Sequence, residues 1–257
     1  MRHTPRKRFG QNFLVDPYVI SNIIDTIHPQ KSDCIVEIGP GLGALTQPLL
    51  KLLDHLYVVE LDRDIVTKLE RMFSGDMLTI YSADALKFDF STLGNNLRVI
   101  GNLPYNISTP ILFHLSRFSE HITDMHFMLQ KEVVARMVAI PSTSDYGRLS
   151  VMLQYRFEME QVFIVPPESF QPVPKVESAI VRMFPLKQPI LTAKNEALFA
   201  KIVSAAFSQR RKTLRNTLQH YLNAEDFMVV GIDSGLRAEN LTVEQFVSIA
   251  DYLAAKT

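Results

Sequence analysis

Short runs of apolar residues alternate with amphipathic stretches over the first half of the chain, and each run ends on a polar or glycine-rich segment. Strands that alternate with helices at this spacing are typical of a parallel sheet covered by helices on both faces. Such sheets bind ligands at the carboxyl ends of their strands. The pattern therefore predicts an α/β fold, with strands at 34–38, 57–61, 77–81, 97–100 and 124–129 and helices at 45–53, 64–73 and 131–139.

The pattern changes in the second half. Two apolar runs, 157–165 and 176–184, follow one another without a helix between them, which favours an antiparallel hairpin at the edge of the sheet. Beyond about Leu191 only helical periodicity is left, and it is clearest at 197–221 and 243–254. We therefore expect two domains, one containing the sheet over residues 1–187 and a small all-helical one over residues 188–257.

The composition is that of an ordinary globular protein, with 47% hydrophobic and 21% charged residues. Cys34 is the only cysteine, so the chain cannot form an internal disulfide, and we expect a reducing, cytoplasmic location. No apolar stretch approaches the roughly 18 residues that a membrane helix needs. The N-terminus lacks the apolar segment of a signal peptide. The scattered histidines and the single cysteine predict no metal site.

The charges balance, with 27 basic and 27 acidic residues, but basic residues gather in two places. Positive potential confined to patches can bind phosphates even when the total charge is zero. Both groups are therefore candidate nucleic-acid surfaces, although a solvated tail and a solvated helix face have the same sequence pattern. The groups are Arg6, Lys7 and Arg8 near the start, and Arg210, Arg211, Lys212 and Arg215 on the helix expected at 197–221.

A glycine turn and two carboxylates follow the first three predicted strands. Gly39, Gly41 and Gly43 differ in spacing from the G-x-G-x-x-G of dinucleotide sites, and by themselves they fit a plain tight turn. Glu60, at the end of the second strand, is placed to accept both hydroxyls of a ribose. Asp84, after the third strand, can accept a hydrogen bond from an adenine amine. Each acid alone could be a helix cap or a surface charge, but together they indicate a nucleoside site.

The segment after the fourth strand, Asn102-Leu103-Pro104-Tyr105, fits the [Asn/Asp/Ser]-x-Pro-[Tyr/Phe] pattern of methyltransferases that act on planar amines. An adenine amine is a poor nucleophile because its lone pair is delocalised into the ring. The Asn102 side-chain oxygen and a backbone carbonyl near Leu103 could accept its two N–H groups and favour the charge that develops during attack. Pro104 would fix the direction of the carbonyl, and Tyr105 offers a face for stacking. Phe170, in a proline-rich loop, is either a second wall for the base or an aromatic packed under the loop.

These motifs together favour S-adenosylmethionine as the cofactor, with S-adenosylhomocysteine as the product. A nicotinamide dinucleotide needs room for its pyrophosphate at a helix N-terminus. S-adenosylmethionine carries no phosphate, so the G-x-G-x-x-G spacing is not required.

Over nearly its whole length the chain resembles the bacterial small-subunit ribosomal RNA adenine dimethyltransferases, the family whose loss gives kasugamycin resistance. The resemblance implies a Rossmann-like S-adenosylmethionine-dependent methyltransferase domain followed by a small helical domain. Segments 37–43 and 102–108 are shared with many methyltransferases, and the rest are more specific to the family. The segments that carry the resemblance are 9–14, 37–43, 102–108, 146–150, 170–178 and 210–216.

The resemblance also implies roles for individual residues. Tyr105 and Phe170 would clamp the target base, and Asn102 would stand between this base and the cofactor. The cofactor-binding residues would be Asn12 and Leu14 at the methionine end, Gly39 and Gly41 against the cofactor, Glu60 at the ribose, Asp84 at the adenine, and Asn102.

The family transfers four methyl groups to two adjacent adenosines in a hairpin loop near the 3′ end of 16S ribosomal RNA, in an assembling 30S subunit. By resemblance, the helical domain and the basic residues beside the active site bind this RNA, although some arginines could instead pair with Glu225 and Asp226. We expect a monomer with no DNA or membrane partner.

Three alternatives stay open at this point. The nearest is the sister enzyme that methylates a large-subunit adenine and confers macrolide resistance, but segments 170–178 and 210–216 favour the small-subunit family. A non-catalytic RNA-binding assembly factor on the same fold would not need Asn102 and Tyr105. A nicotinamide dehydrogenase gives no account of residues 102–105.

Overall fold

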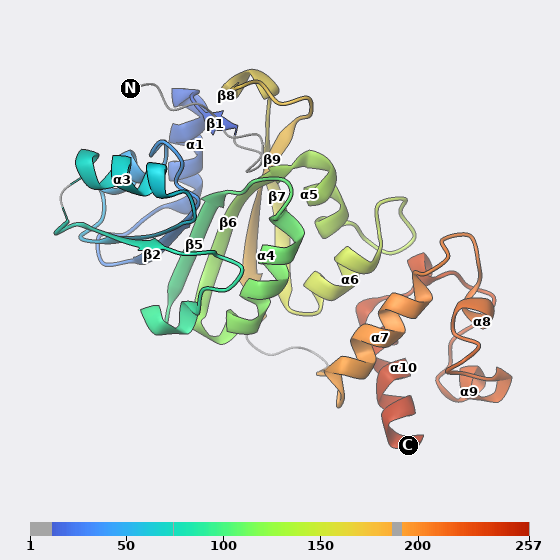
Figure 1. The fold of residues 1–257 in the computed structure, drawn as a ribbon. Helices are drawn as coiled ribbons and strands as arrows, with labels where there is room; N and C mark the ends of the chain where they lie inside the picture. Colours follow the sequence, from blue (N-terminus) through green and yellow to red (C-terminus); the bar gives the residue numbers. More distant parts are fainter. Residues whose placement is uncertain (1–11, 74, 187–191, 257) are drawn as a thin grey trace. The chain divides into compact units, whose positions relative to one another are not determined.

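A seven-stranded mixed sheet forms the centre of the first part of the chain (Figure 1). The computed structural model describes residues 12–73, 75–186 and 192–256. The strands lie in the order β4-β3-β2-β5-β6-β9-β7, in which β4 to β6 are parallel and β9 pairs antiparallel with β6. They are β2 (Cys34–Ile38), β3 (Leu56–Glu60), β4 (Leu78–Ser82), β5 (Leu97–Asn102), β6 (Ile122–Gln130), β7 (Phe157–Val165) and β9 (Ser178–Pro185).

The predicted α/β fold is confirmed, and each predicted strand is present to within two residues at either end. The two late strands are neighbours, with β7 at the edge of the sheet. The helix expected over 45–53 is much shorter, because only α2 (Thr46–Leu49) is helical. After Leu49 the backbone tightens, since the N–H of Lys51 donates to the carbonyl of Pro48 at 3.2 Å, three residues back instead of four.

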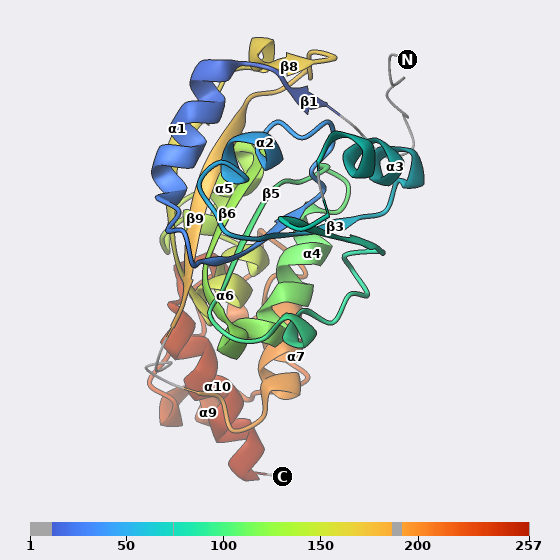
Figure 2. The ribbon, with the colours of Figure 1, turned by 90° about the vertical axis from the view of Figure 1, so that its left-hand side faces the viewer.

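Helices pack on both faces of the sheet. Figure 2 shows α1 (Pro17–Ile27) and α4 (Ser108–Leu115) on opposite sides of β5 and β6. Asp16 caps the start of α1, and its carboxylate accepts the N–H of Tyr18 at 2.9 Å. The remaining α-helices of this part of the chain are α3 (Arg63–Met72) and α5 (Lys131–Val138).

The strand order places a crevice at the end of the sheet. From β2 the chain adds β3 and β4 on one side and then β5 and β6 on the other. Loops that leave neighbouring strands in opposite directions open a crevice at their carboxyl ends, and ligands of α/β proteins bind there. The segments that follow β2, β3, β4 and β5 therefore meet at one site.

A small second sheet, which the sequence did not predict, joins the N-terminal segment to the proline-rich loop. β1 (Phe13–Leu14) pairs antiparallel with β8 (Phe170–Gln171), so that Leu14 lies opposite Phe170. The N–H of Val15 donates to the carbonyl of Ser169 at 2.9 Å. Strands of two residues carry no detectable periodicity, so this pairing was not visible in the hydrophobic pattern.

The chain divides into two compact units, and the second has its own core. The first unit runs to Val134 and includes Met159–Pro185. The second combines Ala135–Glu158 with the described part of Leu186–Thr257. The expected division at 187/188 thus leaves out one segment, because α6 (Arg148–Gln154) and the residues beside it pack into the helical core. There Tyr155 stacks obliquely on Phe199 with ring centroids 4.5 Å apart.

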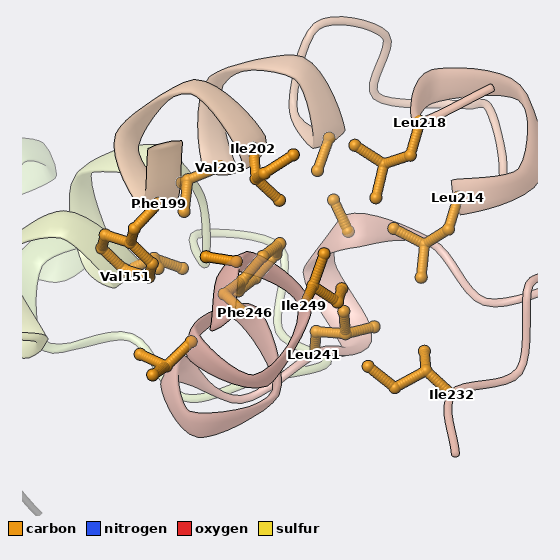
Figure 3. Close-up of a cluster of buried hydrophobic side chains, with 14 of the residues drawn as sticks. Val151, Phe199, Ile202, Val203, Leu214, Leu218, Ile232, Leu241, Phe246 and Ile249 are labelled. Atoms are coloured by element: carbon orange, nitrogen blue, oxygen red, sulfur yellow. The ribbon is translucent and has the colours of Figure 1, made fainter. Parts of the chain in front are cut away.

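The core of the second unit consists of apolar side chains from α6, α7 (Glu196–Ala206), α8 (Leu214–Thr217) and α10 (Val243–Lys256) and from the segments between them (Figure 3). The α9 helix (Ala224–Val229) adds Phe227. The long helix expected over 197–221 is wrong. α7 ends at Ala206, and a turn over 207–213 separates it from α8. The backbone leaves the helix here because Thr213 bridges to Arg237 and the N–H of Leu214 donates to the carbonyl of Leu236 at 2.8 Å.

Candidate active site

One pocket at the carboxyl ends of the parallel strands brings together every residue that the sequence assigned to the cofactor or the target base. The predicted residues that line the pocket are Asn12, Leu14, Gly39, Gly41, Glu60, Asp84, Asn102, Leu103, Pro104, Tyr105 and Phe170.

No helix in the described ranges is long and apolar enough to cross a membrane.

The turn after β2 needs glycine for its backbone conformation. Gly39 and Gly41 have φ angles of 65° and 56°, in the left-handed region that residues with a Cβ rarely adopt. A Cβ on Gly41 would also lie 3.1 Å from the Phe13 ring of β1. The turn can therefore bring its backbone close to a ligand, and the Phe13 ring of β1 packs against it.

Glu60 is held at the end of β3 with only 8% of its surface exposed. One carboxylate oxygen accepts the backbone N–H of Asp62 at 2.7 Å. Burial raises the pKa of Glu60, and backbone hydrogen bonds from Asp62, Leu61 and Gly41 oppose this shift by stabilising the charged form. This arrangement fixes the carboxylate at the pocket wall, where it can accept hydrogen bonds from hydroxyl groups.

Glu37 is a pocket residue that the sequence analysis did not single out. It lies on β2, is 2% exposed, and accepts a hydrogen bond from the Thr46 hydroxyl at 2.6 Å. Burial raises its pKa to about 7, and the nearby charge of Glu60 adds to the shift. An acid inside an apolar strand was the available signal, because a buried strand rarely contains an ionisable side chain without a specific reason.

Asp84, after β4, is half-buried and uses one oxygen locally. Its Oδ1 accepts the backbone N–H of Leu86 at 3.0 Å and so fixes the turn. The other carboxylate oxygen has no hydrogen-bond partner among the described residues, and Asp84 lines the pocket. One oxygen can therefore hold the turn while the other accepts a ligand N–H.

Asn102 ends β5, and its amide orientation is set by the N-terminal segment. The Nδ2 group donates to the carbonyl of Asn12 at 3.2 Å, which leaves the Oδ1 atom as the group that can face a ligand amine. The following turn has its own support, since the carbonyl of Pro104 accepts the N–H of Ile107 at 3.1 Å and the hydroxyl of Ser108 at 3.2 Å. The N–H of Leu103 donates to Met128 on β6 at 3.2 Å.

The two aromatic residues assigned to the target base lie in different surroundings. Tyr105 is half-buried, and its hydroxyl shares a hydrogen bond of 2.9 Å with that of Ser178. Phe170 is 2% exposed and packs in a hydrophobic cluster with Leu14 while also lining the pocket. The packing of Phe170 under its loop is thus confirmed, and its role as a second wall for the base stays a prediction.

The predicted RNA-binding residues within the described part of the chain do not line this pocket. Arg6, Lys7 and Arg8 lie outside the described residues. The other four are exposed side chains of the second unit, where the turn over 207–213 and α8 carry Arg210, Arg211, Lys212 and Arg215.

Local partners hold some of these cations. Arg210 donates to the carbonyl of Ser144 at 2.9 Å and lies 4.0 Å from the carboxylate of Glu239. Asp226, which the sequence offered as a partner for the arginines, is instead 2.7 Å from the ammonium of Lys256. With its side chain 72% exposed, Arg210 pairs only weakly with Glu239.

Residues 2–255 match the family model described as "Ribosomal RNA adenine dimethylase". The chain is 69% identical to a "Ribosomal RNA small subunit methyltransferase A" of Nitrosospira multiformis, covering 98% of this chain and 97% of the relative. It is 68% identical to the protein of the same name from Nitrosomonas europaea, covering 97% and 96%. The chain belongs to the ribosomal RNA adenine dimethylase family.

Solved structures of this enzyme family have the same fold. A dimethyladenosine transferase from Plasmodium falciparum matches with a TM-score of 0.80 and 26% identity over 92% of this chain and 95% of that one. The 23S rRNA methyltransferase ErmE matches with a TM-score of 0.73 and 25% identity over 95% and 100%. These comparisons confirm the predicted Rossmann-like methyltransferase fold, and the chain is an rRNA adenine dimethyltransferase.

The pocket fits the S-adenosylmethionine on which this enzyme family depends. Two carboxylates on successive strand ends match the ribose hydroxyls and the amine of an adenosine, and the glycine turn leaves backbone room beside them. The cofactor supplies an electrophilic methyl group. The Asn102 Oδ1 atom and a backbone carbonyl near Leu103 are candidate acceptors for the two N–H groups of a planar amine, an arrangement in which the amine lone pair leaves the plane of the ring.

Proposed function

We propose that this enzyme dimethylates the exocyclic amines of two adjacent adenosines near the 3′ end of 16S ribosomal RNA, within the assembling 30S subunit. The observation that carries the proposal is the convergence of Glu60, Asp84, Asn102 and Tyr105 on one pocket. These groups come from three separate strand ends and serve no common structural purpose. Relatives at 60–69% identity that bear the small-subunit name favour 16S over 23S RNA as the substrate.

In this proposal the pocket has a cofactor side and a substrate side. Glu60 accepts the ribose hydroxyls of S-adenosylmethionine, and Asp84 accepts the adenine amine. Gly39 and Gly41 pass close to the cofactor, and Asn12 and Leu14 flank its methionine end. The cofactor side is thereby assembled from β1, β2, β3 and β4.

On the substrate side, Asn102 Oδ1 and the Leu103 carbonyl accept the two N–H groups of the target adenine. Pro104 fixes the direction of that carbonyl, and the base stacks between Tyr105 and Phe170, with each stacking contact contributing about 1–3 kcal/mol. No general base is required, because the amine proton becomes acidic only after the methyl group is transferred. Hairpin loops suit this chemistry, since their bases can be turned out of the stack.

The basic residues of the second unit are the proposed contact with the RNA backbone. Arg211, Lys212 and Arg215 are exposed, and Arg210 is held only weakly by Glu239. A turn that projects several cations can follow phosphates without reading sequence. The enzyme would act as a cytoplasmic monomer, since its substrate particle is large and asymmetric.

The proposal is tested by incubating the protein with tritiated S-adenosylmethionine and unmethylated 30S subunits, with 50S subunits as the control. Primer extension on the labelled RNA then maps the modified bases. Label on adjacent adenosines near the 3′ end of 16S RNA supports the proposal. Label confined to 50S particles would assign the enzyme to the large subunit, as in the macrolide-resistance sister family.

A further inference from the structure

Ser178 lies behind the aromatic wall of the substrate side and does not line the pocket. It is fully buried, with 0% of its surface exposed, and its hydroxyl is 2.9 Å from the hydroxyl of Tyr105. Tyr105 lines the pocket, and its hydroxyl is bound to this buried partner. The hydrogen bond thus joins a residue of the pocket wall, Tyr105, to a buried residue of β9.

The position of Ser178 is fixed by backbone pairing. It is the first residue of β9 and lies opposite Gln130, the last residue of β6. The residue before it, Glu177, accepts the backbone N–H of Lys131 at 3.0 Å and pairs with the Lys131 ammonium at 2.7 Å. The serine hydroxyl therefore has little freedom to move, and it can serve as a fixed reference point for a neighbouring side chain.

The turn that carries Tyr105 is attached to β6, the strand that also pairs with Ser178, since the N–H of Leu103 donates to the carbonyl of Met128 on β6. A phenol ring can rotate about two side-chain bonds, and the backbone anchor does not restrict these rotations. The hydrogen bond to Ser178 restricts the rotation about Cα–Cβ, because this rotation would carry the phenolic oxygen away from the serine. The place of the ring in the pocket wall, which decides where a base can stack on it, follows from this contact.

Phe170 lies on the segment 169–178, which ends at Ser178. Its start is fixed by a second buried serine, Ser169, which is 2% exposed and donates its hydroxyl to Asp16 at 2.9 Å. Its end is fixed by Ser178. One segment thus holds Phe170 directly and Tyr105 through the serine, so the spacing of the two aromatic walls is set within a single piece of structure.

We infer that Ser178 is a positioning residue for methyl transfer, which holds the Tyr105 ring in place and so sets its spacing from Phe170. This inference rests on the proposed function, in which both aromatics hold the target adenine. Without Ser178 the base would still enter the pocket, but its amine would align less often with the acceptors at Asn102 and Leu103. Misalignment of a bound substrate lowers the rate of the chemical step more than it lowers binding.

The test is a double-mutant cycle of Ser178→Ala and Tyr105→Phe, which each remove one of the two hydroxyls. Single-turnover methylation of 30S subunits should slow roughly tenfold in either variant, the size expected when one buried hydrogen bond is lost and its partner is left unsatisfied. The double variant should be no slower than the singles, because both changes break the same contact. S-adenosylmethionine affinity, measured by calorimetry, should stay at the wild-type value in all three.

Ser150→Ala is the matched control. Ser150 is also fully buried and donates its hydroxyl to a backbone carbonyl, that of Arg136, but it lies in the second unit. This variant should lower the urea midpoint and keep the wild-type single-turnover rate. If Ser178→Ala does not fold, Tyr105→Phe alone still tests the contact, because Tyr105 is only half-buried.

Several results would overturn the inference. They are a wild-type rate for Ser178→Ala or Tyr105→Phe, or a double variant whose loss is the product of the two single losses. These results differ from a failure of the proposed function, in which the wild-type enzyme itself would not methylate 30S subunits. A fully active Tyr105→Ala would contradict the stacking role of Tyr105 and not the 16S substrate.

Discussion

The role proposed for Asp84 can be tested with a substitution that keeps the local structure. In Asp84→Asn the side-chain oxygen can still accept the N–H of Leu86, a bond of 3.0 Å that holds the turn. The other oxygen becomes an NH₂ group, which would point a donor at the amine of the cofactor's adenine. The change therefore removes one ligand contact and keeps the fold.

The expected size follows from the contact that is lost. A hydrogen bond to a charged group contributes about 1.5–3 kcal/mol, and every 1.4 kcal/mol corresponds to a factor of about ten in affinity. The dissociation constant for S-adenosylmethionine should therefore rise about 10- to 150-fold, as measured by isothermal titration calorimetry. Asp89→Asn is the matched control, because Asp89 caps a turn in the same way, through the N–H of Ser91 at 3.1 Å, but is exposed and does not line the pocket.

A second ligand separates recognition from general damage. S-inosylhomocysteine carries a carbonyl where S-adenosylhomocysteine carries the amine. Wild-type enzyme should prefer the adenine compound, and Asp84→Asn should narrow this preference, because its NH₂ group can donate to the carbonyl. Unchanged affinity for S-adenosylmethionine, or an equal loss for both nucleosides, would refute the assignment of Asp84 to the adenine amine.

Three further predictions concern catalysis, RNA binding and pH. Asn102→Ala should slow methyl transfer by about 10²–10³ with little change in calorimetric cofactor affinity, because its oxygen acts mainly in the transition state; normal turnover would remove it from the mechanism. Replacing Arg210, Arg211 and Lys212 by Gln should weaken 30S binding and flatten its dependence on salt in filter-binding assays, and an unaltered slope would place the RNA contact elsewhere. Burial lowers the pKa of His126 to about 4, so the folded protein resists its protonation and loses stability as the pH falls from about 6.5 towards 4. The free energy of unfolding should fall by about 2 kcal/mol more between pH 7 and pH 5 in wild type than in His126→Gln, as measured by urea titration, and equal slopes would contradict this.

The strands and the pocket could be predicted because their signals are local. Apolar runs that end on Glu60 and Asp84 place both acids at strand ends, and parallel strands bring those ends together. The Asn102–Tyr105 motif needs only its place after β5 to reach the same pocket. Predictions of this kind succeed because the period of the hydrophobic pattern locates each strand and the shared direction of parallel strands places their ends together.

Features that depend on tertiary pairing were missed or placed wrongly. The helix expected over 197–221 is interrupted because the backbone at Thr213 and Leu214 pairs with residues more than twenty positions away, and local helical periodicity does not register this pairing. The sheet of β1 and β8 joins residues 13–14 to 170–171 for the same kind of reason. Ser178 carries no recognisable signal of its own, since its contact with Tyr105 arises only once β9 pairs with β6.

The most direct test of the account counts the methyl groups on the RNA. Unmethylated 30S subunits are incubated with the enzyme and S-adenosylmethionine, the 3′-terminal fragment of 16S RNA is released by ribonuclease, and its mass and nucleosides are measured. In an incubation just long enough for wild-type enzyme to finish, we predict two adjacent N6,N6-dimethyladenosines in this fragment with wild type and at most a trace with Asn102→Ala. A fragment that stays unmodified while the enzyme binds S-adenosylmethionine, or one modified equally by Asn102→Ala, would contradict it.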